Sequence, residues 1–78
     1  MQLKILRVMA NMTQAEAAAA VGVTQAALSD WENGKYKPNP TAVTKLAEAY
    51  RVTEAEVVQA VVDTMEKANE ATDGEDTD

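Results

Sequence analysis

Apolar residues along the first part of the chain recur every three or four positions, which is the spacing of an amphipathic helix. Leu3, Leu6, Met9 and Ala10 follow this spacing and predict a first helix over roughly residues 2–11. No segment alternates apolar and polar residues as a half-buried strand does, and the one Asn-Gly pair follows a helical pattern. The pattern therefore predicts an all-α domain.

Capping residues predict where the next two helices begin and end. Residues 13–16 read Thr-Gln-Ala-Glu, which is a capping box. The side chain of Thr13 can accept from the backbone amide of Glu16, and the side chain of Glu16 can accept from the backbone amide of Thr13. It opens an alanine-rich helix that Gly22 is expected to close as a left-handed C-cap. Thr24 is the next expected N-cap, and Gly34 the next expected C-cap.

Two further helices follow from the same reasoning. Asn39 is expected as an N-cap before a proline at the first helical position, which opens a helix to about Tyr50. Thr53 to Glu56 is a second capping box, and it predicts a fifth helix that runs to about residue 68. The expected core consists of Leu6, Met9, Met12, Ala18, Val21, Val23, Leu28, Trp31, Val43, Leu46, Ala47, Tyr50, Val52 and Val57.

Charge divides the 78 residues into two parts. The whole chain has 7 basic and 13 acidic residues, hence a formal net charge of −6. Residues 1–62 hold six of each sign, whereas residues 63–78 hold seven acids and one base. We therefore expect a neutral domain over 1–62, followed by an extension of the fifth helix that frays into an acidic, disordered tail. Solubility is the simplest role for the tail, and competition with DNA for the domain's own basic loop is the alternative.

The amino-acid composition argues against several classes of function. The chain has no Cys and no His, so it lacks thiol nucleophiles, imidazole bases and the commonest metal ligands. We expect no enzyme, no cofactor, no metal site and no small-molecule substrate. No apolar run approaches the ~20 residues of a membrane-spanning helix, and the start lacks the features of a signal peptide. The expectation is a soluble cytoplasmic protein without a membrane partner.

The most informative segment is 13–37, where two short helices are joined by Val21-Gly22-Val23 in a helix-turn-helix pattern. In the second helix, successive side chains are separated by about 100° around the axis. The apolar side then contains Ala27, Leu28 and Trp31. The opposite side is small and polar, and consists of Gln25, Ala26, Ser29, Asp30 and Asn33. Such a face suits the major groove of DNA.

The sequence TQAEAAAAVGVTQAALSDWENGKYKP resembles the lambda-repressor/Cro-like helix-turn-helix family of the xenobiotic-response-element type. The resemblance covers residues 2–62 and includes the spacing of its motifs as well as their residue types. It implies a five-helix fold with the helix-turn-helix at the second and third helices. It also implies a sequence-specific transcription regulator, in particular a small dimeric repressor of phage or prophage type that reads a palindromic operator with helix 24–33.

The resemblance implies roles for individual residues. Those expected to read bases are Gln25, Ala26, Ser29 and Asp30, and those expected to contact phosphates are Gln14, Thr24, Asn33, Lys35 and Lys37. Arg7 and Glu32 match a structural ion pair, which is favoured over a contact between Arg7 and DNA. The alternative for Gln14, Gln25, Lys35 and Lys37 is that they are ordinary solvated side chains without a contact to DNA. Asp30 either accepts from cytosine N4 or repels phosphates.

Two departures from the family pattern affect the expectation. Ala26 and Ala27 leave the recognition helix with few hydrogen-bonding side chains, although alanine can contact a thymine methyl group. Arg51 stands where many members have glycine. The few basic residues predict weak binding by a monomer, which two linked domains on a palindrome would strengthen.

An apolar stripe on the fifth helix suggests how two copies associate. Val57, Val58, Val61, Val62 and Met65 lie on one continuous face. We expect a homodimer through Val58, Val61, Val62 and Met65, with packing inside the domain as the alternative for Val57 and Val61. The alternative function is a protein-binding module on the same fold, such as an antirepressor or antitoxin-like partner.

Overall fold

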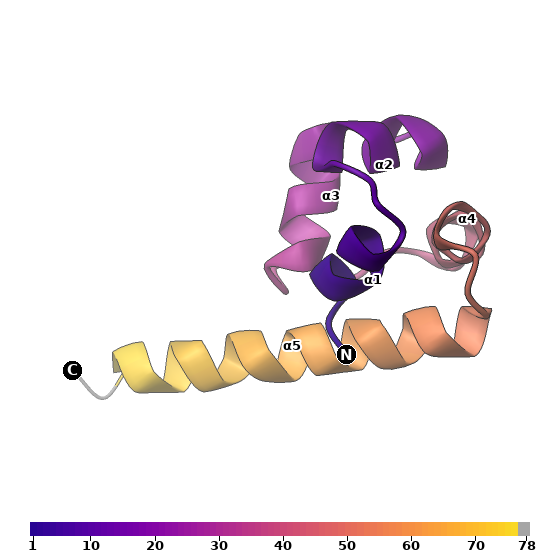
Figure 1. Cartoon of the computed structure of the whole chain (residues 1–78). Coiled ribbons are helices and arrows are strands. Elements are labelled where there is room, and N and C mark those ends of the chain that lie inside the picture. Colours follow the sequence, from indigo (N-terminus) through magenta and orange to yellow (C-terminus); the bar gives the residue numbers. More distant parts are fainter. Residues whose placement is uncertain (77–78) are drawn as a thin grey trace.

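The computed structural model describes the backbone of residues 1–76 and the side chains of residues 1–69. Within this part the chain forms five helices and no strand: α1 (Leu3–Met9), α2 (Gln14–Val21), α3 (Gln25–Glu32), α4 (Pro40–Tyr50) and α5 (Glu54–Asp76) (Figure 1). The all-α, five-helix prediction is confirmed.

The predicted N-caps are present, because each uses a local hydrogen bond that the sequence itself encodes. The Thr13 hydroxyl accepts from the Glu16 amide at 3.1 Å, and the Glu16 carboxylate accepts from the Thr13 amide at 2.9 Å, which completes the capping box. Thr24, Asn39 and Thr53 each accept a backbone amide three residues further on. These bonds satisfy amides that have no partner inside a helix.

Helix ends agree less well with the sequence prediction. Gly22 closes α2 in the left-handed conformation as expected, with φ +83°. Helix α1 is shorter than predicted, since it ends at Met9 and Asn11 then adopts φ 61°. The C-cap of α3 is Asn33, and Gly34 follows it with φ +74°. Helix α5 continues to Asp76, beyond the end predicted near residue 68.

The core forms between all five helices. Leu28, Leu46 and Val57 are its largest fully buried side chains. The other predicted members are buried or pack partly buried against the core, except Met9, which is 69% exposed. That prediction was wrong because Met9 lies six residues after Leu3. At about 100° per residue, its side chain is about 120° away from that of Leu3 around the helix and faces away from the core. Among the side chains of residues 1–69, four buried apolar residues were not predicted: Leu3, Ala17, Ala42 and Ala60.

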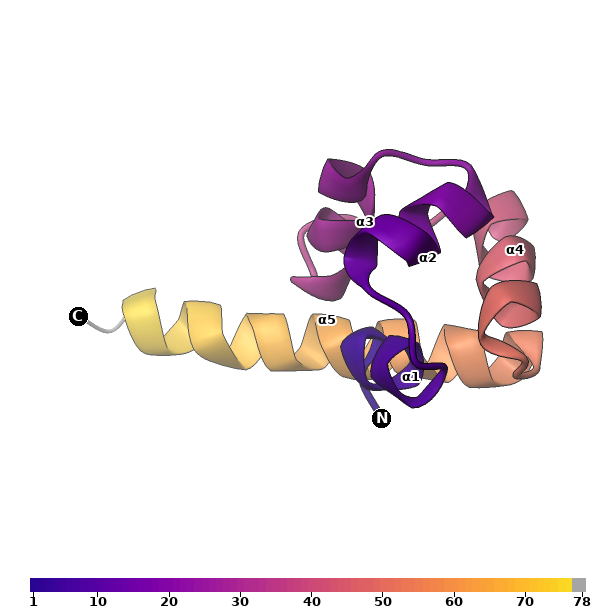
Figure 2. The same ribbon diagram turned by 45° about the horizontal axis from the view of Figure 1, so that its top comes forward.

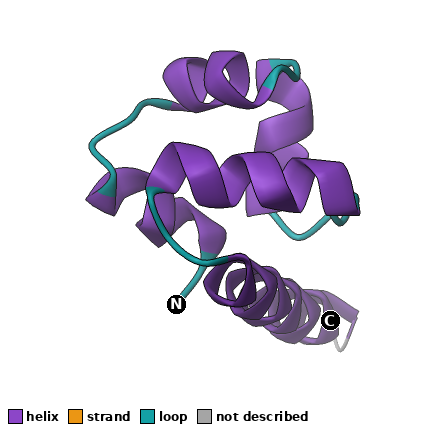
Figure 3. Ribbon diagram, turned by 90° about the vertical axis from the view of Figure 1, so that its right-hand side faces the viewer, coloured by secondary structure: helices purple, strands orange, loops and turns teal. Residues whose placement is uncertain are grey.

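Helix α5 forms the base on which α1, α3 and α4 pack, as the nearly end-on view in Figure 3 shows. The contacts continue beyond residue 62, where the sequence places the domain boundary. Buried Thr64 accepts from the Leu3 amide at 3.0 Å, and a Cβ placed on Gly34 would lie 2.6 Å from the Ala68 Cβ. The last turns of α5 then project past the other helices (Figures 1 and 2).

Candidate nucleic-acid interface

Helices α2 and α3 are held at a fixed angle by a three-residue turn. Val21 is buried and Val23 is half-buried, so both anchor the turn in the core. The Gly22 and Val23 amides both donate to the Ala18 carbonyl, at 2.8 and 2.9 Å. Because Gly22 has nothing within 4 Å of a hypothetical Cβ, its backbone conformation alone favours glycine there.

Helix α3 buries one face and presents the other to solvent. Leu28 and Trp31 are buried, whereas Gln25 and Ala26 are exposed. Ser29, Asp30 and Asn33 continue the outer face, and Asn33 Nδ2 donates to Ser29 Oγ at 3.3 Å. The structure therefore gathers the residues predicted to read bases on one accessible surface.

Gln25, the first residue of α3, is tied to the first residue of α2. Gln25 Nε2 donates to Gln14 Oε1 at 3.5 Å, and Gln14 Nε2 donates to Glu32 Oε1 at 3.0 Å. These bonds restrict the rotamers of both glutamines before any ligand arrives. Sequence reasoning placed Gln14 beside a phosphate and did not foresee its link to Gln25, since the two residues are eleven positions apart.

Arg7 and Glu32 form an ion pair between α1 and α3. Arg7 Nε donates to Glu32 Oε2 at 2.6 Å, and Arg7 Nη1 donates to the Met12 carbonyl at 2.9 Å. Both side chains are largely shielded from water. The hydrogen bond to Glu32 raises the pKa of Arg7 above its ordinary value, against the opposing effect of burial. The pair thus fixes the end of α3, and through Gln14 it also fixes the start of α2.

A basic loop follows α3. The Lys35 and Tyr36 amides donate to the Asp30 carbonyl, which folds the loop back on the end of the helix. Lys35, Tyr36 and Lys37 are all exposed, and Lys35 Nζ lies 5.6 Å from the centre of the Tyr36 ring. Thr24 is exposed at the start of the same helix. Cationic side chains therefore lie next to the outer face of α3.

A family model described as helix-turn-helix, of the lambda-repressor/Cro-like type, matches residues 3–57. The chain belongs to this family. No curated protein and no solved structure gives a significant match. Helix-turn-helix membership makes the chain a DNA-binding transcription regulator, and its family is regulatory rather than enzymatic.

Tyr36 also lies on this helix-turn-helix surface, and no role was predicted for it from the sequence. The residue is 59% exposed, and it stands between Lys35 and Lys37 in the sequence of the loop after α3. An aromatic residue flanked by two lysines in a predicted loop is a pattern that could have drawn attention to it, because a tyrosine hydroxyl is one of the groups that bond phosphates.

Among residues 1–69, no group of three or more carboxylates is placed to hold a metal ion. No helix in the described part has both the length and the apolar character needed to cross a bilayer. The predicted dimer residues lie on α5, where Val58 and Val62 are exposed and Val61 and Met65 are half-buried.

Proposed function

We propose that the protein is a small, sequence-specific repressor that inserts α3 into the major groove of its operator. The observation that supports this most directly is the outer face of α3. It is small and accessible, and it begins with Gln25, whose amide is oriented by Gln14. An oriented side-chain amide loses less rotational freedom when it pairs with a base, so this link supports base reading.

Each residue of the surface has a proposed role. Gln25 pairs with adenine N6 and N7, and Ala26 contacts a thymine methyl group. Ser29 and Asp30 reach the next base pairs, where Asp30 accepts from cytosine N4. The proposed phosphate contacts are Gln14, Thr24, Asn33, Lys35 and Lys37, and we add Tyr36 to them.

The regulator is proposed to bind a palindrome as a homodimer. Only a few basic side chains lie beside α3, so a single domain neutralises few phosphates and binds weakly. Two domains joined through Val58, Val61, Val62 and Met65 would bind two half-sites one helical turn apart. Occupancy of such an operator in the cytoplasm would exclude polymerase and so repress transcription.

Selection of bound sequences from a random DNA pool tests the proposal. We expect one enriched palindromic site. Gln25→Ala should weaken binding to it by about 1–3 kcal/mol and relax selection at one base pair in each half-site. Gln59→Ala, which removes an exposed glutamine on α5, is the matched control and should bind normally. A pool that yields no enriched sequence at low salt would contradict the proposal.

A protein-binding role is the second candidate, and the outer face of α1 favours it. Ile5 is 44% exposed, Val8 58% and Met9 69%, so a helix of seven residues presents three large apolar side chains to solvent. Exposed apolar patches often mark partner surfaces. An antirepressor or antitoxin-like module would select no DNA sequence, and Val8→Glu would abolish its association with a partner protein.

A further inference from the structure

The loop after α3 lies directly on the backbone of α5. A Cβ placed on Gly34 would lie 2.6 Å from the Ala68 Cβ and 3.1 Å from the Thr64 carbonyl oxygen. Because Gly34 has no side chain, the loop and α5 approach more closely there than a side chain would allow. Its left-handed conformation, with φ +74°, also favours glycine. The loop and α5 are therefore in contact at the point where the loop leaves α3.

The part of α5 that meets this loop lies within residues 63–68, which we call the support segment. It begins after residue 57, where the match to the helix-turn-helix family model ends. It is fixed to the domain at a second place, because buried Thr64 Oγ1 accepts from the Leu3 amide at 3.0 Å and donates to the Ala60 carbonyl at 2.8 Å. The support segment is thus held against both α1 and the loop, whereas the last turns of α5 project past the other helices (Figures 1 and 2).

The loop has only weak internal restraints on its two lysines. Its own hydrogen bonds run to the Asp30 carbonyl, from the Lys35 amide at 2.9 Å and from the Tyr36 amide at 3.5 Å, which is long for such a bond. Over residues 1–69, neither Lys35 nor Lys37 forms an ion pair. Glycine has more backbone freedom than any other residue, so Gly34 would let the loop turn about its start. Contact with the support segment limits that turn.

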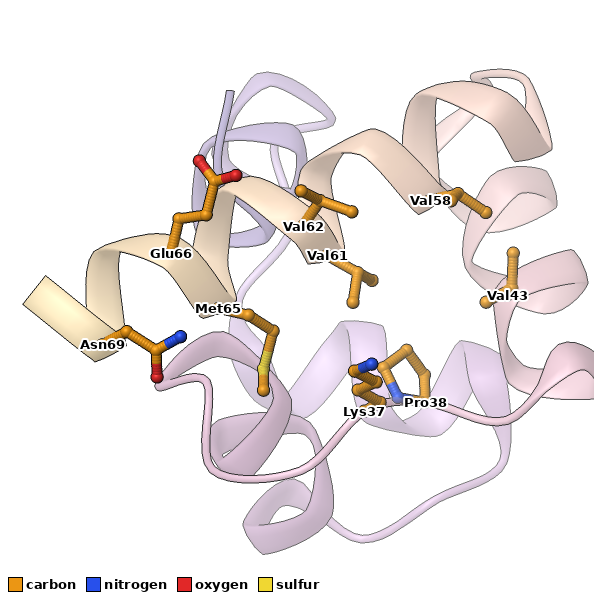
Figure 4. Close-up of a pocket in the computed structure, with 9 residues that line it drawn as sticks. All are labelled: Lys37, Pro38, Val43, Val58, Val61, Val62, Met65, Glu66 and Asn69. Atoms are coloured by element: carbon orange, nitrogen blue, oxygen red, sulfur yellow. The ribbon is translucent and has the colours of Figure 1, made fainter.

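An apolar groove of about 350 Å³ opens between the loop and α5 beyond this contact (Figure 4). Lys37 and Pro38 line the loop side of the groove, and Met65 and Asn69 lie on the α5 side. Lys37 is exposed, so packing of its side chain does not fix its position. The position of its ammonium group therefore depends on the loop backbone, and hence on the contact at Gly34.

We propose that Ala68 is a positioning residue for DNA binding. Its methyl group lies against the backbone of Gly34 and sets the distance between the loop and α5. That distance decides where Lys35 and Lys37 lie relative to the outer face of α3. Phosphate contacts fix the register of a protein on DNA, and they have to form while α3 lies in the major groove. A loop displaced from α5 loses these contacts even though Gln25 still reaches its base. This role rests on the proposed function.

Ala68→Ile in the full chain tests the role. Isoleucine in a helix has one strongly preferred χ1 rotamer, so its branched side chain cannot turn freely away from the loop. We expect the operator dissociation constant to rise about tenfold near 0.1 M salt. The slope of log K against log salt concentration should become shallower by about 1–2, which corresponds to the loss of one or two phosphate contacts. The selected base sequence should stay the same, because α3 itself is unchanged.

Two variants serve as controls. Ala55→Ile makes the same substitution at an exposed position in the first turn of the same helix, and Ala68→Ser conserves the size of the side chain. Both should bind the operator like the wild type. If circular dichroism shows that Ala68→Ile does not fold, Ala68→Val carries the same test with a smaller branched side chain. Unchanged affinity in the variant tested, or a loss of affinity with an unchanged salt slope, would overturn the proposal.

Amide hydrogen exchange without DNA separates this proposal from the proposed function. The Lys35 amide donates to the Asp30 carbonyl, and in Ala68→Ile it should exchange about tenfold faster, while amides in the middle of α4 exchange as in the wild type. Unchanged exchange at Lys35 would show that the support segment does not hold the loop, and would overturn the proposal. Faster exchange in a chain whose wild type selects no DNA would instead contradict the proposed function and leave the contact between α5 and the loop standing.

Discussion

Arg51 is a non-glycine residue in the left-handed conformation, with φ 58° and ψ 45°, at the C-cap of α4. A side chain with a Cβ is disfavoured there by roughly 1–2 kcal/mol. We expect Arg51→Gly to raise the free energy of unfolding by up to about 1 kcal/mol, because glycine also gains freedom in the unfolded chain.

The matched control makes the opposite substitution, glycine to alanine, at Gly22, the left-handed C-cap of α2. Gly22→Ala meets no atom within 4 Å, so its cost is that of the backbone conformation alone, about 1 kcal/mol. Urea unfolding followed by circular dichroism measures both variants. Loss of stability in Arg51→Gly would show that the arginine side chain makes a stabilising contact that outweighs its strained backbone.

Tyr50 makes stability depend on pH in the alkaline range. Burial, reinforced by the nearby Glu32 carboxylate, raises the pKa of Tyr50 from 10.0 to about 12. Below pH 10 the folded and unfolded chains both keep the phenolic proton. Between pH 10 and about 12 only the folded chain keeps it, so the free energy of unfolding should fall as pH rises through this window.

Tyr50→Phe removes the phenolic hydroxyl, so the difference between this variant and the wild type gives the contribution of Tyr50 to the pH dependence. The Tyr50 hydroxyl is buried without a hydrogen-bond partner, so its removal should not lower stability near pH 7. Denaturant midpoints measured from pH 8 to 12 should therefore decline less in Tyr50→Phe than in the wild type. Tyr36→Phe, which changes an exposed ring, should decline like the wild type.

At the scale of elements, the Arg7–Glu32 pair joins α1 to α3 and, through Gln14, to α2. Glu32→Ala leaves the Arg7 guanidinium shielded from water without its counter-charge, which should cost about 3–5 kcal/mol. That is comparable with the net stability of a core this small, so the single variant should be largely unfolded near room temperature. The double variant Arg7→Met, Glu32→Leu should unfold closer to the wild type, since apolar residues of similar volume replace the pair.

Thermal unfolding followed by circular dichroism distinguishes these two variants. If Glu32→Ala lost less than about 1 kcal/mol, solvent would already stabilise Arg7, and the pair could not be what holds α1 against α3. If the double variant were as unstable as the single one, the hydrogen bonds of Arg7 to Met12 and of Gln14 to Glu32 would carry the stability instead.

The helix starts could be predicted from the sequence, whereas several tertiary features could not. A cap such as Thr13 or Asn39 bonds an amide three residues away, so its partner lies within the same short segment. The exposure of Met9 and the packing of Gly34 against Ala68 depend on how distant helices meet, which helical periodicity does not specify. The same holds for the candidate site. The outer face of α3 followed from its periodicity, but the link between Gln14 and Gln25 needed the angle between two helices.

At the scale of the whole molecule, the net charge of −6 opposes binding to DNA, although the domain that carries α3 is formally neutral. Residues 69–78 hold five acidic residues and no basic one. Their repulsion of phosphates acts over a distance set by the ionic strength, about 10 Å at 0.1 M salt. Their effect on affinity should therefore depend strongly on salt.

Deletion of residues 69–78 should tighten operator binding about three- to tenfold near 20 mM salt and leave it unchanged near 0.3 M. Fluorescence anisotropy with labelled operator DNA measures both conditions. The control keeps the full length and replaces the acids of this segment by the corresponding amides, so it removes the charge but not the chain. If both variants gain equally, repulsion is the cause. If only the deletion gains, the bulk of the segment obstructs DNA, and if neither gains, the acidic residues do not oppose binding and their simplest role is solubility.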